Sequence, residues 1–298
     1  MKTIVLTDSF SLEDSLKSSL EAKWYTVISD NSLTQDQKKT TIAIITYVWD
    51  SITSTYLQQY PSCKYVLTAS TWVNHIDHAY CTAHGITIFS AAWVNSSSVA
   101  EFAICMMINL LRHIPHHITD TRMGIWHQRL WNNLAWKTIW FLWCGNIAQH
   151  IAWKLIWFSI WSFIGYDPYG KQSVLDSYNI HLQSLQEVCE QSDVICMQLP
   201  STDETYHLLN DSVFKLIKKN PYLINIWRGD TLCTTALINA LQNNIIAWVA
   251  CDVFEWEPTI NETLRTFPNV ILTPHIASKT VETKFQLAHA VIEKLLSQ

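Results

Sequence analysis

Glycine is the residue that this sequence most lacks. The chain of 298 residues has 6 glycines and 15 tryptophans, whereas average usage of about 7% predicts roughly 21 glycines. The tryptophans stand where turns and close helix contacts favour glycine, as at Trp72, Trp93, Trp136, Trp140, Trp143, Trp153, Trp157, Trp161 and Trp248. We hypothesise that most of these positions are glycine in the natural protein. One mechanism would be a source organism that reads the UGA codon as glycine, with the sequence translated as if UGA encoded tryptophan. The alternative is a genuinely tryptophan-rich chain, and Trp126 fits an authentic tryptophan.

Positive charge, cysteine pairs and long apolar runs are also scarce. A formal net charge of −5 argues against a nucleic-acid partner. The eight cysteines show no C-x-x-C spacing, and Met1 to Val5 resembles a strand and not a signal peptide, so we expect reduced thiols in a cytoplasmic protein. The most apolar region, residues 136–166, is interrupted by Lys137, Asn146, Gln149, His150 and Lys154. A membrane role is therefore the weaker reading.

Short apolar runs alternate with amphipathic stretches along the whole chain. In the first hundred residues the expected strands are Thr3–Thr7, Thr26–Ser29, Ile42–Tyr47, Tyr65–Ala69 and Ile86–Phe89, with helices at Leu12–Ala22 and Leu33–Lys39. A long buried helix should begin near Ser97. Strands that alternate with helices predict parallel α/β sheets, and the length of the chain predicts two domains.

A second alternating series predicts a complete doubly wound sheet. Its six expected strands are Thr138–Leu142, Ser162–Tyr166, Val194–Leu199, Tyr222–Ile226, Ile246–Val253 and Val270–Thr273. Residues 281–296 repeat apolar side chains at helical spacing. We expect this last helix to pack on the first domain.

A dinucleotide-binding fingerprint follows the first strand of this second series. In such a motif two glycines and a small residue form the turn and the start of the helix, and an acidic residue about twenty positions on binds the ribose. Here Gly145 and Ala148 match, whereas the first glycine is replaced by Trp143. The acidic residue is Asp167, which favours NAD over NADP.

Three chemically active side chains follow later strands of the same series. Arg228 can hold a carboxylate through its bidentate fork, and His275 can exchange a proton near neutral pH. A carboxylate bonded to that imidazole would fix its tautomer and favour its protonated form. Glu257 is the expected partner, whereas Glu255 is expected to be solvated. Each residue alone also fits a structural role in a loop, but all three should lie at one edge of the sheet.

The chain resembles the D-isomer-specific 2-hydroxyacid dehydrogenase family over nearly its whole length. The resemblance rests on Asn74-His75-Ile76-Asp77, Ser98-Val99-Ala100-Glu101, the fingerprint with Asp167, Leu199-Pro200 with Thr205, Arg228-Gly229, Asp252-Val253-Phe254 with Glu257-Pro258, and Pro274-His275. This set in this order is specific, although each member alone is weak.

The resemblance implies an α/β fold with two doubly wound parallel-sheet domains. A Rossmann NAD-binding domain, residues 98–277, would be inserted into a split flavodoxin-like substrate domain, residues 1–97 and 278–298. The implied function is interconversion of a 2-oxo acid and a D-2-hydroxy acid by hydride transfer, with NAD as cofactor and no metal. Homodimers are usual in the family.

The resemblance also assigns roles to individual residues. His275 would be the acid and base, Glu257 its support and Arg228 the carboxylate ligand. Expected cofactor contacts are Gly145, Asn146, Ile147, Asp167, Pro200, Thr205 and Asp252, the last on the nicotinamide carboxamide. Expected substrate contacts, besides Arg228, come from a loop of Ser70, Thr71, Trp72 and Val73.

Departures from the family pattern keep other interpretations open. Trp72, Trp143 and Trp227 replace small residues, and Gln198 replaces a frequent histidine. If the tryptophans are authentic, the alternative is a non-catalytic binding protein or pseudoenzyme on the same scaffold. A relative of S-adenosylhomocysteine hydrolase or of the amino-acid dehydrogenases shares the nucleotide fold, but the order Arg228, Glu257, His275 argues against it.

Overall fold

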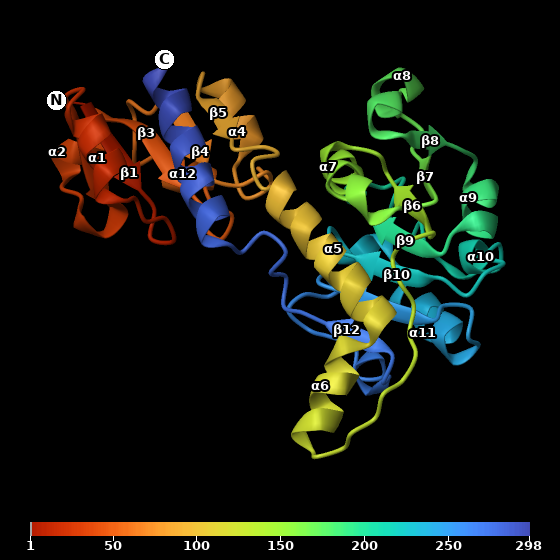
Figure 1. Ribbon diagram of the computed structural model, residues 1–298. Coiled ribbons are helices and arrows are strands. Elements are labelled where there is room, and N and C mark those ends of the chain that lie inside the picture. The colour runs from red at the N-terminus through yellow and green to blue at the C-terminus, as the bar shows by residue number, and fades with distance from the viewer. Residues whose placement is uncertain (1) are drawn as a thin grey trace. The chain divides into compact units, whose positions relative to one another are not determined.

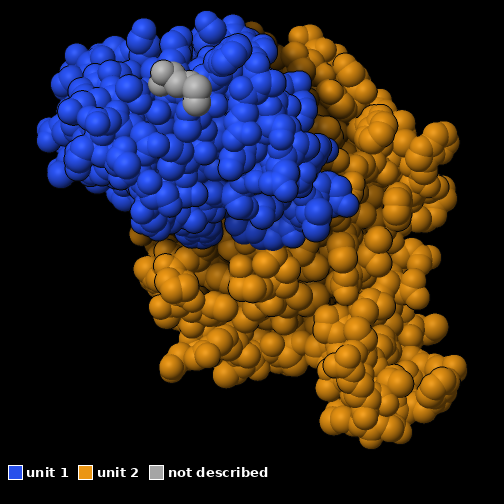
Figure 2. Space-filling model, turned by 90° about the vertical axis from the view of Figure 1, so that its left-hand side faces the viewer, with its two compact units in different colours: residues 1–95, 279–298 blue, residues 96–278 orange. Residues whose placement is uncertain are grey.

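The computed structural model describes residues 2–298, and the chain forms two compact units. Unit 1 comprises residues 1–95 and 279–298, and unit 2 comprises residues 96–278. Figure 2 colours them separately. Each unit has its own sheet, and all strand pairs within the two sheets are parallel. The fold class predicted from the alternation of strands and helices is confirmed.

Unit 1 contains a five-stranded sheet in the order β2-β1-β3-β4-β5, which is the flavodoxin-like order. Its strands are β1 (Lys2–Leu6), β2 (Tyr25–Ser29), β3 (Thr41–Thr46), β4 (Tyr65–Thr68) and β5 (Thr87–Ser90). Its helices are α1 (Asp14–Glu21), the 3-10 helix η1 (Asp30–Ser32), α2 (Gln35–Thr40), α3 (Ser54–Leu57), α4 (His78–Ala83) and α12 (Val281–Leu296).

The strands of unit 1 are apolar on both faces because helices cover both sides of the sheet. Alternate residues belong to different cores: Ile4 packs in a cluster with Leu20 of α1 and Leu287 of α12, whereas its neighbour Val5 packs with Leu57 of α3. Figure 1 shows α1 and α12 together on one side of this sheet. The expected return of the C-terminal helix to the first domain is confirmed.

Unit 2 contains a seven-stranded sheet in the order β12-β11-β10-β9-β6-β7-β8. Its strands are β6 (Thr138–Leu142), β7 (Ser162–Tyr166), β8 (Ile180–Leu182), β9 (Val194–Met197), β10 (Tyr222–Asn225), β11 (Trp248–Cys251) and β12 (Val270–Leu272). Its helices are α5 (Ser96–Arg112), α6 (Ile114–Arg122), α7 (Asn146–Lys154), η2 (Ile156–Phe158), α8 (Gln172–Leu175), η3 (Asp176–Tyr178), α9 (Leu185–Gln191), α10 (Asp211–Phe214), η4 (Gly229–Thr231), α11 (Thr234–Gln242) and η5 (Leu264–Thr266). Strand order reverses between β6 and β9, which makes their carboxyl ends the expected ligand position in such a sheet.

Strand β8 was not predicted from the sequence. It has three residues and pairs only with β7 at the edge of the sheet, and Ile180 is its one buried side chain. So short a strand carries too little apolar pattern to be recognised. Strands β6 and β7 and helix α12 have the predicted bounds. The strands are short, mostly apolar runs, and α12 repeats apolar side chains at helical spacing over 16 residues.

No single helix within residues 2–298 is long and apolar enough to cross a membrane, although the bent pair α5 and α6 passes a test of length and composition. All eight cysteines are free, and six are buried. Burial raises the pKa of the Cys63 and Cys251 thiols to about 12. Such thiols stay protonated at neutral pH and behave as core residues.

A substitution at Gly165 in β7 would probe how closely the sheet packs against the turn after β6. A Cβ atom at this position would lie 2.3 Å from Cys144 Sγ and 3.2 Å from Ile180 Cγ2. We expect Gly165→Ala to lower the free energy of unfolding by about 1–3 kcal/mol in urea titrations, because the added methyl overpacks a closed core. Cys144→Ala removes the nearer atom and should restore most of that loss. An equal loss in both backgrounds would show that the contact with Cys144 is not the cause.

Candidate functional site

The predicted catalytic and cofactor residues of unit 2 follow the carboxyl ends of its strands. Asp167 follows β7, Arg228 follows β10, and Asp252 follows β11 directly. His275 follows β12 by three positions, and the fingerprint turn follows β6. Because the strands are parallel, these segments leave the sheet at one edge.

His275 and Glu257 form a hydrogen-bonded pair, with His275 Nδ1 at 2.8 Å from Glu257 Oε2. The other carboxylate oxygen, Oε1, accepts the backbone N–H of Phe254 at 3.0 Å. Burial raises the pKa of Glu257, but the bonds from His275 and Phe254 and the charge of Arg228 outweigh it, so the net pKa is lowered. Glu257 is therefore an oriented anion that leaves Nε2 as the ring nitrogen available for chemistry. About a third of each side chain is exposed.

Asp252 holds the loop that carries His275. Its buried carboxylate accepts the Thr273 hydroxyl at 2.6 Å, the Ile276 N–H at 2.9 Å and the Ala277 N–H at 2.8 Å. Its backbone oxygen accepts the His275 N–H at 2.8 Å. Both carboxylate oxygens are engaged within the protein, so Asp252 acts here as the anchor of the loop, and its expected contact with a nicotinamide stays a prediction.

Arg228 is half-buried, and its backbone is held by a side chain that the sequence analysis did not single out. Asn225 Nδ2 and Thr231 Oγ1 both donate to the Arg228 carbonyl, at 3.0 and 2.8 Å. Burial lowers the pKa of Arg228, whereas the charges of Glu257 and Asp230 raise it. The signal for Asn225 was present: a buried amide at the end of an apolar strand needs a partner.

Glu255 does not lie in solvent as expected. Only 6% of its side chain is exposed, and its Oε1 lies 2.6 Å from His207 Nε2. Its Oε2 accepts the N–H of Thr234 at the start of α11 at 3.2 Å. The expectation was wrong because its partner is 48 residues away in the chain, in a loop whose position the sequence does not reveal. The two glutamates of this segment thus bind two different histidines.

The fingerprint segment forms a turn and the start of α7. Gly145 precedes the helix without a side-chain cap, and nothing lies within 4 Å of the Cβ position that it lacks. The N–H groups of the first turn, at Asn146 and Ile147, therefore have no capping side chain, which suits an anion. Trp143, however, has a φ of 78° and a half-buried indole whose ring centroid lies 5.9 Å from that of Tyr169.

Asp167 is bonded to the same turn. Its Oδ2 accepts the Cys144 N–H at 3.0 Å, and its Oδ1 accepts the Tyr169 N–H at 2.9 Å. Gln198, which was unexplained by sequence, is buried beneath this turn. With its amide nitrogen facing inward, it donates to the carbonyls of Leu142, Cys196 and Trp143 at 3.1, 2.9 and 3.2 Å. It therefore ties β9 to the fingerprint turn.

The remaining expected contacts lie in two loops. In unit 2, Thr205 is buried and its hydroxyl bonds the Pro200 carbonyl at 2.5 Å, which shapes the loop after β9. In unit 1, Ser70 follows β4, and its hydroxyl bonds Thr68 Oγ1 at 2.8 Å and the Trp72 carbonyl at 2.6 Å. Thr71 Oγ1 lies 3.4 Å from Asn95 Oδ1, and Val73 packs at the edge of the core. Within residues 2–298 no group of three His, Cys, Asp or Glu side chains is placed to hold a metal ion.

Comparison with known proteins places these features in one family. Residues 104–277 match the family model described as D-isomer specific 2-hydroxyacid dehydrogenase, NAD binding domain. The chain is 33% identical to a glyoxylate reductase of Thermofilum pendens over 86% of this chain and 77% of that protein. It is 29% identical to a D-3-phosphoglycerate dehydrogenase of Bacillus subtilis over 99% of this chain but 57% of that longer protein.

Solved structures agree with this result. A D-lactate dehydrogenase of Aquifex aeolicus, complexed with NAD and lactic acid, superposes with a TM-score of 0.80. The alignment covers 99% of this chain and 94% of that structure at 25% identity. Sequence motifs, sheet order and the match over more than half of the chain lead to the same conclusion: this chain belongs to the D-isomer specific 2-hydroxyacid dehydrogenase family.

Proposed function

We propose that this protein is an NAD-dependent dehydrogenase that interconverts a 2-oxo acid and a D-2-hydroxy acid. The observation that carries the proposal is the pair of His275 and Glu257 beside Arg228. The pair stands at the carboxyl edge of a sheet whose family domain binds NAD. Glyoxylate reductases and D-lactate dehydrogenases among the relatives support 2-oxo acids as the substrate class.

The protein residues can supply the carboxylate contact and the proton. The Arg228 guanidinium would bind the substrate carboxylate through two parallel N–H donors. His275 Nε2 would donate a proton to the carbonyl oxygen during reduction and accept the hydroxyl proton during oxidation. Glu257 would hold His275 Nδ1 in a hydrogen bond during both reduction and oxidation, so that only Nε2 faces the substrate.

The residues of the nucleotide turn fit the cofactor only in part. Gly145, the uncapped start of α7 and Asp167 suit a dinucleotide, and an acidic residue at 167 favours NAD over NADP. The indole of Trp143 does not fit, because the fingerprint needs a glycine at the first turn position. We therefore derive no step through the cofactor and place the tests below in protein that carries glycine at position 143.

His275→Ala should lower kcat for reduction of a 2-oxo acid by about 10²–10⁴-fold, the usual contribution of a general acid. Steady-state assays with NADH and a panel of glyoxylate, pyruvate and hydroxypyruvate measure this loss. NADH affinity, measured by fluorescence, should stay unchanged because the imidazole is not part of the nucleotide turn.

The matched control is His289→Ala. His289 forms a similar pair with Glu293 at 3.5 Å, but on the exposed surface of α12 in unit 1. Its loss should leave kcat unchanged. Full turnover by the His275 variant would remove this residue from the mechanism.

Arg228→Gln should lower kcat/KM by about 10- to 100-fold, because a charge-assisted hydrogen bond contributes roughly 1.5–3 kcal/mol. The effect should be larger for 2-oxo acids than for the same compounds with the carboxylate replaced by an amide. Arg265→Gln serves as the control, since Arg265 forms only an exposed pair with Glu262. Equal losses with acid and amide substrates would rule out a carboxylate contact.

A further inference from the structure

Four tryptophans have a backbone conformation that bulky residues rarely adopt. The φ angles are 65° at Trp24, 68° at Trp93, 63° at Trp136 and 78° at Trp143. In this left-handed region the Cβ atom crowds the backbone, so glycine is the usual residue, and Asn or His is the usual exception. The other six non-glycine residues with positive φ are in fact three His, two Asn and one Ser.

Glycine itself is the minority in this conformation. Among residues 2–298 only two glycines, Gly85 and Gly124, have positive φ, whereas four tryptophans do. In an ordinary protein, glycines with positive φ far outnumber tryptophans with positive φ. The backbone therefore identifies these four positions by an observation that is independent of the composition.

Burial does not compensate for the strained conformation at three of the four positions. The exposed fractions are 81% for Trp24, 50% for Trp93 and 72% for Trp136. Trp24 also stands just after α1, where its N–H bonds the Glu21 carbonyl at 2.9 Å. A left-handed residue after a helix end is most often glycine.

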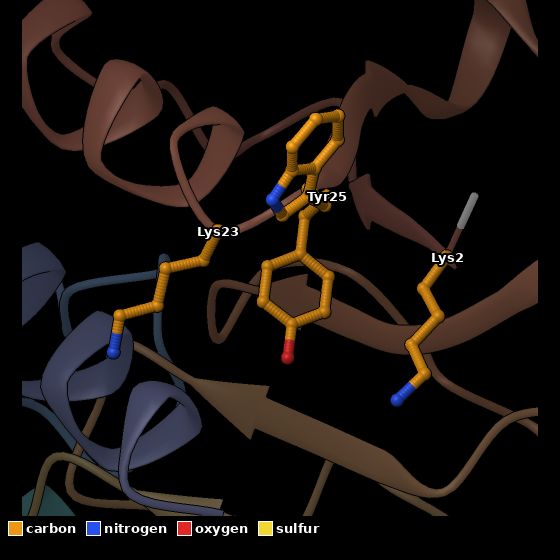
Figure 3. Close-up of a pocket in the computed structure, with 4 residues that line it drawn as sticks. Lys2, Lys23 and Tyr25 are labelled. Atoms are coloured by element: carbon orange, nitrogen blue, oxygen red, sulfur yellow. The ribbon is translucent and has the colours of Figure 1, made fainter.

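Trp24 also lines a surface pocket together with Lys2, Lys23 and Tyr25, which are labelled in Figure 3. Because the pocket depends on an indole in a strained position, we assign it no ligand.

Trp140 adds evidence from side-chain chemistry. It lies in β6 with no exposed surface, and its indole Nε1 has no hydrogen-bond partner. A buried indole N–H is normally bonded. An unpaired donor in an interior strand of the sheet indicates a side chain for which the surrounding residues offer no acceptor.

Trp143 links this pattern to cofactor binding. Its N–H bonds the Tyr166 carbonyl at 2.9 Å, which fixes the turn between the ends of β6 and β7. The indole then lies near Tyr169, two residues after Asp167. The indole therefore packs beside the segment that carries the acidic residue, next to the turn whose backbone a nucleotide must approach.

We infer that the protein made in its native cell carries glycine at positions 24, 93, 136 and 143, read from UGA codons, and that glycine at 143 is required for NAD binding. Trp140 belongs to the same set by its unpaired indole. Trp126 does not: it is exposed, but its φ is not positive. It provides a matched control.

Mass spectrometry of the protein purified from its native source tests the identity of the residues. The tryptic peptide of residues 138–154 contains positions 140 and 143, with cleavage after Lys137 and Lys154. Fragment masses for glycine at both positions, together with UGA at the corresponding codons, support the inference. Fragment masses for tryptophan at 143 overturn it.

Recombinant protein tests the consequence for the cofactor. NADH fluorescence titration should give no measurable binding with the chain as written, and micromolar binding, at least 100-fold tighter, with Trp143→Gly. Trp126→Gly should behave as the parent. Micromolar binding by the parent, or no gain in a folded Trp143→Gly protein, overturns the role of residue 143.

Thermal melts test the other three positions without reference to activity. Trp24→Gly and Trp93→Gly in the smaller unit 1, and Trp136→Gly in unit 2, should each raise Tm by about 2–8 °C, because glycine relieves the strained backbone. Trp126→Gly should not raise Tm. A loss of Tm at all three positions contradicts the inference.

If the parent does not fold, recovery of soluble protein by the combined four-glycine variant supports the inference. Failure of that variant to fold as well counts against it. Gain of NADH binding without reduction of any 2-oxo acid would leave this inference standing and reject the proposed function.

Discussion

Short turns at the carboxyl edge of the seven-stranded sheet determine where every candidate functional group of unit 2 can lie. Asp167 and Asp252 each directly follow a strand, so the end of that strand fixes the position of each carboxylate. The turns also contact one another closely. Gln198 bonds the carbonyl of Trp143, and Asp252 bonds three groups of the loop after β12. A change in the conformation of one turn is therefore transmitted to its neighbours.

The apolar pattern of the sequence was sufficient for most of the framework. Strands β6 and β7 and helix α12 were predicted with their observed bounds, the strands from compact apolar runs and α12 from apolar residues repeated at helical spacing. Strand β8 was missed because an edge strand of three residues buries a single side chain. The expected proximity of Arg228, Glu257 and His275 came from the rule that parallel strands end at one edge, which needs no side-chain detail.

Contacts between distant loops were not predictable. The sequence places Glu255 in a polar segment, and only the fold brings His207 to it. Gln198 differs from the family pattern, and its bonds to three carbonyls depend on where β6 and β9 meet. Asn225 could have been found, because a buried amide at a strand end requires a partner. The apolar periodicity of the sequence therefore predicts helices and strands, whereas the partners of side chains in distant loops depend on the tertiary fold.

Gly229 has a consequence for how specificity can change in this protein. A Cβ atom there would lie 1.9 Å from the carbonyl carbon of Phe254, so the backbones that carry Arg228 and Glu257 touch directly. Two loops in such contact cannot be lengthened or reshaped one at a time without displacing both charged groups. Under the proposed function, adaptation to a larger or smaller substrate would therefore come from other segments, because these two loops can change only together.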